Sequence, residues 1–338
     1  MRSVRSLTLA GCAALAFAGG DPRPSCANDS SAELSVGGLV FARNADVSLE
    51  SQELTITPES VTVLYRFLNQ SQKPVTLRIA FPLPDIDLAE ADNYAFPTND
   101  PVNFVGFETK VDGKPIKLNI VQRAVLGAKD VGATLRGLGV PLLPLGAQQI
   151  KLTELPQPAR DKLIEEGLLT QAGTNDQGRP LYEATWTVKT SAVRQQTFAP
   201  NRLVTVEHRY RPSVGLSQDT VLRKGLRQNK GMESEVERYR NEYCIQPAFL
   251  TALDKLGGAA EPNTGKVQER RIAYRLKTGA NWAGPIKDFR LVVDRQKTER
   301  LVSFCAPNMK PISPTAIEAS AKDFTPDKDL KILIVGRF

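Results

Sequence analysis

The chain has 338 residues, of which 44 are Lys or Arg, 37 are Asp or Glu and one is His. An apolar fraction of 41% with only four cysteines is typical of a globular protein and excludes a disordered chain, a disulfide-dense miniprotein and a multi-pass membrane protein. A single histidine also excludes metal sites and catalytic mechanisms that need two histidines from one chain.

The first 27 residues have the pattern of a secretory signal peptide. Two arginines precede the uncharged apolar stretch 7–18, which as a helix would span about 18 Å, short of a hydrocarbon core of about 30 Å. The segment Ser25–Ala27 places small residues where a signal peptidase reads them. We expect cleavage after Ala27; the alternatives are cleavage after Ala18, lipidation at Cys12 and retention as a buried helix.

Cleavage would leave two cysteines, Cys244 and Cys305. An even pair in an oxidising compartment most simply forms a disulfide, and the alternative is two free thiols in a reduced interior. The bond would close a loop that spans 61 positions (305 − 244). The chain-entropy model predicts that closing such a loop stabilises the folded state by about 4 kcal/mol.

Residues 28–123 predict an N-terminal β-sandwich part. Apolar and polar residues alternate along 61–68 and 75–81, and prolines end the second strand because they cannot donate to the ladder. Further candidate strands are 34–42, 46–57, 103–111 and 115–123, the last two joined by the turn signal Asp112–Lys114.

The rest of the chain alternates between helical and extended patterns. Residues 124–180 are Gly- and Leu-rich with a helix expected over 156–169 and predict an insertion or lid. Strands return over 181–216, with candidates at 181–188 and 203–210, and a helical segment and linker follow over 217–265. The last segment, 266–338, is a C-terminal β part with candidate strands at 267–278, 287–294, 299–305 and 330–335. Together these segments predict a mainly β protein with one or two antiparallel β-sandwiches and two helical insertions.

Several residues are candidates for a site, each with a structural alternative. His208 shares strand parity with apolar residues and is expected to be structural. Trp282, with Asn281, lies on the Gly-rich loop 279–286, where it could be a ligand platform or a plug that closes one end of a sandwich. An acidic cluster misses the EF-hand spacing and is expected to be solvated; it comprises Asp85, Asp87, Glu90, Asp92 and Asn93.

Two pairs of arginines, Arg209 with Arg211 and Arg271 with Arg275, each share one strand face. They could form a basic face for anionic lipid or an acidic partner, or a solvated sheet face. Aromatic residues are not interleaved with them, which disfavours nucleic acid. The sequence contains no phosphate loop, dinucleotide fingerprint or zinc spacing, so no cofactor is expected.

The run from Val63 to Ser71, followed by Phe81–Pro84, resembles the opening of the vault and inter-alpha-trypsin-inhibitor type domain, a β-sandwich. The whole mature chain resembles the bacterial exported family called domain of unknown function 4424, through its opening Asn28–Ala32 with Gly37-Gly38-Leu39, through Phe81–Pro84 and through Thr278–Ile286. The resemblance implies a periplasmic or secreted protein and carries over no catalytic residue.

The sequence therefore predicts an exported, non-enzymatic protein that binds an unidentified component of the cell envelope. The alternatives are a carboxylate-dependent hydrolase of an envelope glycan and a peripheral binder of anionic lipid through a basic face.

The processing prediction can be checked by intact-mass measurement of the exported protein. We expect a mature chain that begins at Asn28. A retained Met1 or a diacylated Cys12 would contradict it.

Overall fold

A computed structural model describes residues 30–35, 38–41, 44–83, 85–89, 94–145, 152–212, 214–257 and 267–338. The predicted signal peptide and both of its predicted cleavage sites lie outside these residues. Within them, no helix is long and apolar enough to cross a membrane.

An eight-stranded sheet, here called the central sheet, runs through the molecule in the order β20-β21-β18-β3-β4-β15-β8-β9. Its strands are β3 (Val47–Ile56), β4 (Val61–Asn69), β8 (Glu108–Val111), β9 (Lys114–Pro115), β15 (Leu203–Tyr210), β18 (Ile286–Asp294), β20 (Lys310–Pro311) and β21 (Ala316–Phe324).

The two faces of the central sheet differ in polarity, as the period-2 pattern of its strands requires. Along β4, Val61, Val63, Tyr65 and Phe67 are buried, whereas Arg66 between the last two is exposed. Cross-strand ion pairs cover the outer, polar face, namely Arg66–Glu53, Lys110–Glu207, Lys287–Glu50, Arg290–Glu318 and Lys322–Asp288.

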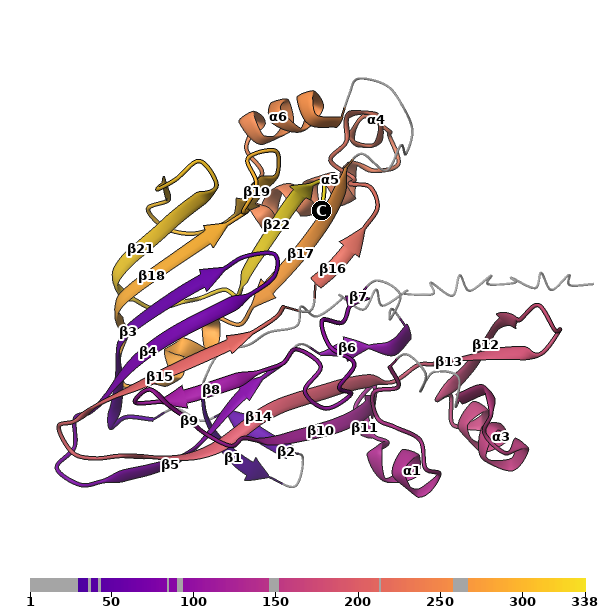
Figure 1. Cartoon of the computed structure of the whole chain (residues 1–338), viewed down its shortest axis with the longest axis horizontal. Helices are drawn as coiled ribbons and strands as arrows, with labels where there is room; N and C mark the ends of the chain where they lie inside the picture. The colour runs from indigo at the N-terminus through magenta and orange to yellow at the C-terminus, as the bar shows by residue number, and fades with distance from the viewer. Residues whose placement is uncertain are drawn as a thin grey trace, which may run out of the picture.

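A second sheet, the lower sheet, covers one half of the apolar face (Figure 1). It has the order β11-β10-β14-β5-β1-β2, with β6 paired to β14. Phe81 of β5 and Phe198 of β14 carry the contact, since their rings lie 5.0 Å from His208 and 5.8 Å from Phe67 of the central sheet. Its strands are β1 (Ser30–Ser35), β2 (Gly38–Phe41), β5 (Val75–Pro82), β6 (Ile86–Asp87), β10 (Asn119–Leu126), β11 (Lys129–Asp130) and β14 (Thr187–Phe198).

A third sheet, the upper sheet, covers the other half and is buried on both sides. In β22, Ile332 and Ile334 belong to the main core, whereas Leu333 and Val335 belong to a separate core under the helices. The order is β19-β22-β17-β16-β7. Its strands are β7 (Tyr94–Ala95), β16 (Val214–Ser217), β17 (Gln268–Tyr274), β19 (Leu301–Phe304) and β22 (Leu330–Gly336).

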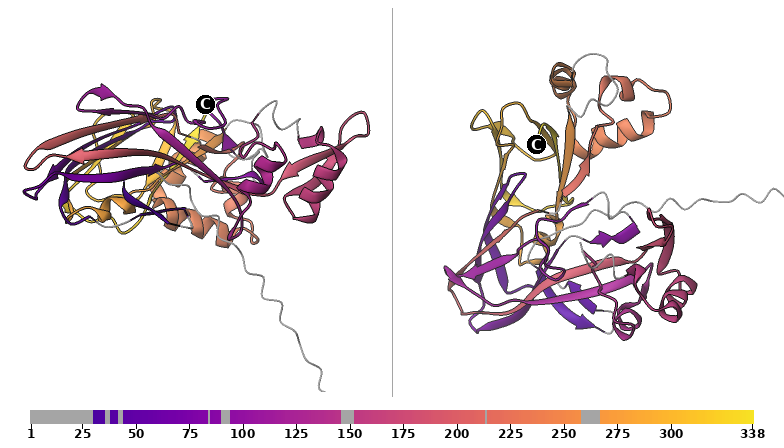
Figure 2. Two further views of the ribbon diagram at one scale, coloured as in Figure 1. Left: turned by 90° about the horizontal axis from the view of Figure 1, so that it is seen from below. Right: turned by 45° about the vertical axis from the view of Figure 1, so that its right-hand side comes forward.

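The helices fall into two groups, as the sequence predicts. Three of them, α4 (Lys224–Arg227), α5 (Glu233–Tyr243) and α6 (Pro247–Gly257), lie on the outer side of the upper sheet (Figure 2). The other group projects beyond the lower sheet in Figure 1 and comprises α1 (Gly132–Gly137), α3 (Gln157–Glu165) and the hairpin of β12 (Leu169–Thr174) with β13 (Pro180–Ala184).

Tyr65 of β4 lies where all three sheets meet. Its hydroxyl is 2.8 Å from that of Tyr274 in β17 of the upper sheet. Its ring centroid is 5.7 Å from that of His208 in the neighbouring strand β15, and the His208 ring lies 5.0 Å from Phe81 of the lower sheet. The mainly β, sandwich-like prediction is confirmed, with two sheets packed against one face of a shared sheet. Segments that the sequence separates, 28–123 and 266–338, both contribute strands to this shared sheet.

The structure departs from the predicted strands in several places. The predicted strand 103–111 shortens to β8, the predicted strand 34–42 overlaps the paired strands β1 and β2, and the predicted strand 181–188 is divided between β13 and β14. The pairing of β3 with β18 is parallel, whereas the other ladders between the described strands are antiparallel. Strand β21 was not expected, because alanine, serine and lysine have low β-propensity, yet it pairs with β18 along its length. Strand β14 extends to Phe198 rather than ending at residue 188, since β5 and β10 hold it on both sides.

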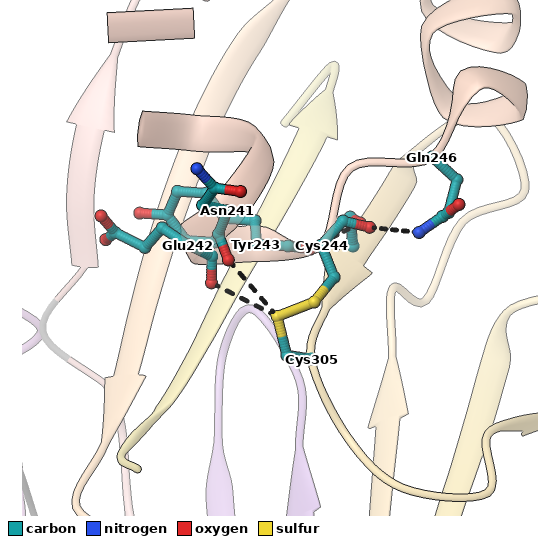
Figure 3. Close-up of a disulfide and its surroundings, with 7 residues drawn as sticks. Asn241, Glu242, Tyr243, Cys244, Gln246 and Cys305 are labelled. Atoms are coloured by element: carbon teal, nitrogen blue, oxygen red, sulfur yellow. Dashed lines mark hydrogen bonds between the residues drawn. A yellow bond between two sulfur atoms is a disulfide. The ribbon is translucent and has the colours of Figure 1, made fainter. Parts of the chain in front are cut away.

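The predicted disulfide joins Cys244 to Cys305, whose Cα atoms are 5.3 Å apart (Figure 3). Cys244 ends α5 in a left-handed conformation with φ of 53°. Cys305 follows β19, and its Sγ lies 3.7 Å from the carbonyl oxygens of Asn241 and Glu242. The bond therefore fastens the end of the helical layer to an edge strand of the upper sheet.

Replacement of both cysteines by serine should lower the free energy of unfolding by about 4 kcal/mol, because the unfolded chain regains the entropy of an open loop of this length. Chemical denaturation measures the loss, and the reduced wild-type protein is the matched control. Quantitative thiol labelling of both cysteines in the mature protein before reduction would contradict the bond.

Candidate functional site

Strands of the central sheet meet at one end around an open groove of about 490 Å³. Its walls come from the β3–β4 turn, the start of β8, the end of β15 and the turn after β18. We call it the strand-end groove and define it by Glu59, Ser60, Glu108, Arg209, Arg211 and Gln296.

Arg209 and Arg211 are the exposed cations of the strand-end groove. They share one side of the chain because they are two residues apart along extended backbone. Among the described residues, neither guanidinium has an ion-pair partner within 4.0 Å. The sequence pattern predicted this pair, and the structure places both members in one groove.

Three arginines of the helical layer form ion pairs within it. Arg223 binds Asp219, Arg227 binds Asp254 and Arg238 binds both Glu235 and Glu242. Hydrogen bonds from the Arg227 guanidinium hold the pKa of the Asp254 carboxyl below its usual range. These three cations are therefore compensated by neighbouring carboxylates of the same layer.

Arg271, the second predicted basic position, is part of a half-buried network under α5. Its guanidinium contacts the carboxylate of Glu269, which is 1% exposed and also accepts a hydrogen bond of 2.7 Å from the Tyr239 hydroxyl. Burial, with the nearby Glu269 carboxylate, raises the pKa of Tyr239. Arg271 thus holds a helix on the upper sheet, and Arg275 lies beyond the end of β17.

Arg270 connects the upper sheet to the strand-end groove. Its guanidinium lies 3.8 Å from a carboxylate oxygen of Glu59 and stacks over the Phe338 ring at 4.0 Å. Burial lowers the pKa of Arg270, while Glu59 opposes that shift. One of the two acids in the groove is therefore paired with a cation.

Trp282 is 4% exposed and packs between sheets instead of lining a surface. Its ring centroid lies 4.5 Å from that of Phe67 and 6.2 Å from that of Phe198. The backbone around it is pinned to β3, because Asn44 donates to the Asn281 carbonyl at 2.8 Å and Ala283 to that of Val47 at 2.9 Å. This position is the one expected of the plug, and it gives Trp282 no exposed face for a ligand.

His208 is fully buried, as its strand parity predicted. Its Nδ1 lies 2.7 Å from the hydroxyl of Thr109, and the rings of Tyr65, Phe81 and Phe107 surround it. This contact set is that of a core residue.

The predicted acidic cluster lies partly outside the described residues, which exclude Glu90, Asp92 and Asn93. Asp85 pairs with Lys189 at 3.2 Å, and Asp87 accepts a hydrogen bond from the amide of Ala89. In the described part of the chain, no group of three potential metal ligands comes together.

Sequence reasoning missed most of the groove. Glu59, Glu108 and Gln296 come from three separate loops or strand ends, and nothing in their local sequence distinguishes them from other surface residues. The one available signal was the pair of arginines on a single strand face.

Trp282→Ala should lower the free energy of unfolding by about 3–5 kcal/mol, because it removes a buried ring from the sheet junction. Trp282→Phe is the matched control and should cost less than about 1.5 kcal/mol, since the indole nitrogen has no hydrogen-bond partner among the described residues. Unchanged stability of the alanine variant would show that the ring is not a plug.

A family model described as "Domain of unknown function (DUF4424)" matches residues 27–333. No curated protein matches the sequence.

Solved structures resemble the chain weakly. A candidate nutrient-binding protein of Legionella pneumophila is 13% identical with a TM-score of 0.44, over 92% of this chain and 72% of that protein. An M1 zinc metallopeptidase of Deinococcus radiodurans is 10% identical with a TM-score of 0.26, over 88% of this chain and 44% of that one. The chain thus spans less than half of the metallopeptidase's length, and at these values the likeness says nothing of activity.

Proposed function

The chain belongs to the family of the domain of unknown function DUF4424, and from this premise and its groove we propose that it is an exported, non-enzymatic protein that binds a component of the cell envelope. The strand-end groove is the binding site in this proposal. The observation that carries it is the pair Arg209 and Arg211, which have no ion-pair partner among the described residues.

The disulfide supports the compartment. A bond between Cys244 and Cys305 persists in oxidising surroundings such as the periplasm or the cell exterior and is rare in the reducing cytosol. Cys305 is exposed, so a reducing environment would have access to it.

The groove supports binding. Exposed arginines on a folded surface usually find carboxylates, as Arg66 does with Glu53 at 3.1 Å on the same sheet. Guanidinium groups left without a partner in a concave site are available to an incoming ligand, and their planar fork suits carboxylate or phosphate. Strand ends of a three-sheet core hold them in place, so a ligand would meet a preformed site.

The alternatives receive less support. A lipid surface needs an extended excess of positive charge, whereas the outer face of the central sheet is covered by compensated ion pairs. A hydrolase needs two available carboxylates, and of the two in the groove Glu59 already has Arg270 beside it.

A photocrosslinking amino acid at Gln296 tests the proposal in living cells. We expect it to capture a defined envelope component, and we expect the Arg209→Gln/Arg211→Gln variant to lose that capture because the cations that hold the ligand are gone. The matched control is the same amino acid at Gln72, an exposed position in the β4–β5 turn at the opposite end of the sheet. Identical capture from both positions, or capture that persists without the arginines, would refute the site.

A further inference from the structure

We infer that the strand-end groove takes a zwitterionic ligand, one with both a carboxylate and an ammonium group, as in an amino acid or a short peptide. This inference rests on the proposed binding function of the groove. It follows from how positive and negative side chains are placed around the groove, and from which of them are already paired.

The two arginines on the positive side of the groove can bind a single carboxylate. Arg209 and Arg211 stand two residues apart on extended backbone, so their attachment points are separated by about 7 Å. Both side chains line the groove and are exposed. Two guanidinium forks at this spacing can converge on one carboxylate, with charge-assisted hydrogen bonds to each oxygen.

The negative side of the groove is Glu108. It is directly opposite Arg209 in the β8–β15 register, a position at which Cβ atoms lie about 4.5–5.5 Å apart. Two positions further along the same ladder, on the same face, Lys110 and Glu207 form an ion pair of 3.5 Å. Arg209 and Glu108 form no such pair within 4.0 Å, and among the described residues Glu108 has no other cation.

Opposite charges that face each other but remain apart, both lining one groove, are complementary to a ligand whose own charges are separated. A ligand carboxylate would bind Arg209 and Arg211, and its ammonium group would bind Glu108. Because Glu59 is beside Arg270, Glu108 is the acid available for this contact.

The remaining features fit a small polar molecule. The volume of about 490 Å³ falls within the range of roughly 300–1,000 Å³ of small-ligand sites. Ser60 adds a hydroxyl to the wall. A polyanion or an anionic lipid headgroup is a poorer match, since Glu108 would repel it.

Titration with the tripeptide Ala-Ala-Ala, followed by backbone amide shifts in NMR spectra, tests the inference. We expect saturable shifts in the groove, with binding weakened about tenfold to a hundredfold when the C-terminus is amidated or the N-terminus is acetylated, since each change removes a charge-assisted contact. Acetate and inorganic phosphate should bind more weakly than the free tripeptide.

Three variants assign each contact. Arg209→Gln/Arg211→Gln should bind the free and the amidated peptide equally, and Glu108→Gln should bind the free and the acetylated peptide equally. Arg202→Gln is the matched control, because this exposed cation lies just before the other end of β15, outside the groove, and pairs with Asp112. The binding of this variant should equal that of the wild type.

The outcomes separate this inference from the function on which it rests. If acetate, phosphate or the acetylated peptide binds as tightly as the free peptide, or if no tripeptide binds, the zwitterion inference is overturned. The proposed binding function is tested separately, by whether crosslinking from position 296 depends on Arg209 and Arg211.

Discussion

The apolar face of the central sheet is the constraint on which the rest of the structure depends. It is too wide to be covered by one partner, so the lower and upper sheets divide it between them. Tyr65 marks the division, because its hydroxyl contacts that of Tyr274 in the upper sheet and its ring contacts His208, which packs on Phe81 of the lower sheet. Burying such a face removes apolar side chains of all three sheets from water, and each Å² of apolar surface buried stabilises the fold by about 25 cal/mol.

The same constraint produces the strand-end groove. The inner side chains of these strands pack in a shared core, which fixes the strands relative to one another. The loops and exposed side chains at the strand ends are therefore held at fixed positions. The β3–β4 turn, the start of β8 and the end of β15 meet in this way. Arg270 from the upper sheet reaches the same place and pairs with Glu59, so the relative position of the sheets also shapes the groove.

Local patterns predicted much of the fold. Alternation along 61–68 and 203–210 identified two neighbouring strands of the central sheet, and the burial of His208 followed from its parity with Val204 and Val206. The patterns failed where neighbours override local preference. Strand β21, rich in small and polar residues, is extended because β18 offers it a complete ladder. The Gly-rich loop around Trp282 left both a ligand platform and a plug open, because its sequence does not reveal that Phe67 lies 4.5 Å away.

By itself, the sequence determined the features that depend on near neighbours along the chain: which strands have one apolar face, where helices interrupt them, and that Arg209 and Arg211 point the same way. Only the tertiary structure decided that residues 47–56 lie parallel to 286–294, which makes one sheet of the two ends of the chain. It also decided that Arg209 and Arg211 share one groove with Glu108, the cross-strand neighbour of Arg209, while Lys110 is already paired. The physical reason is that strand pairing and side-chain convergence join residues far apart in sequence, and no local periodicity specifies which of many compatible strands will become neighbours.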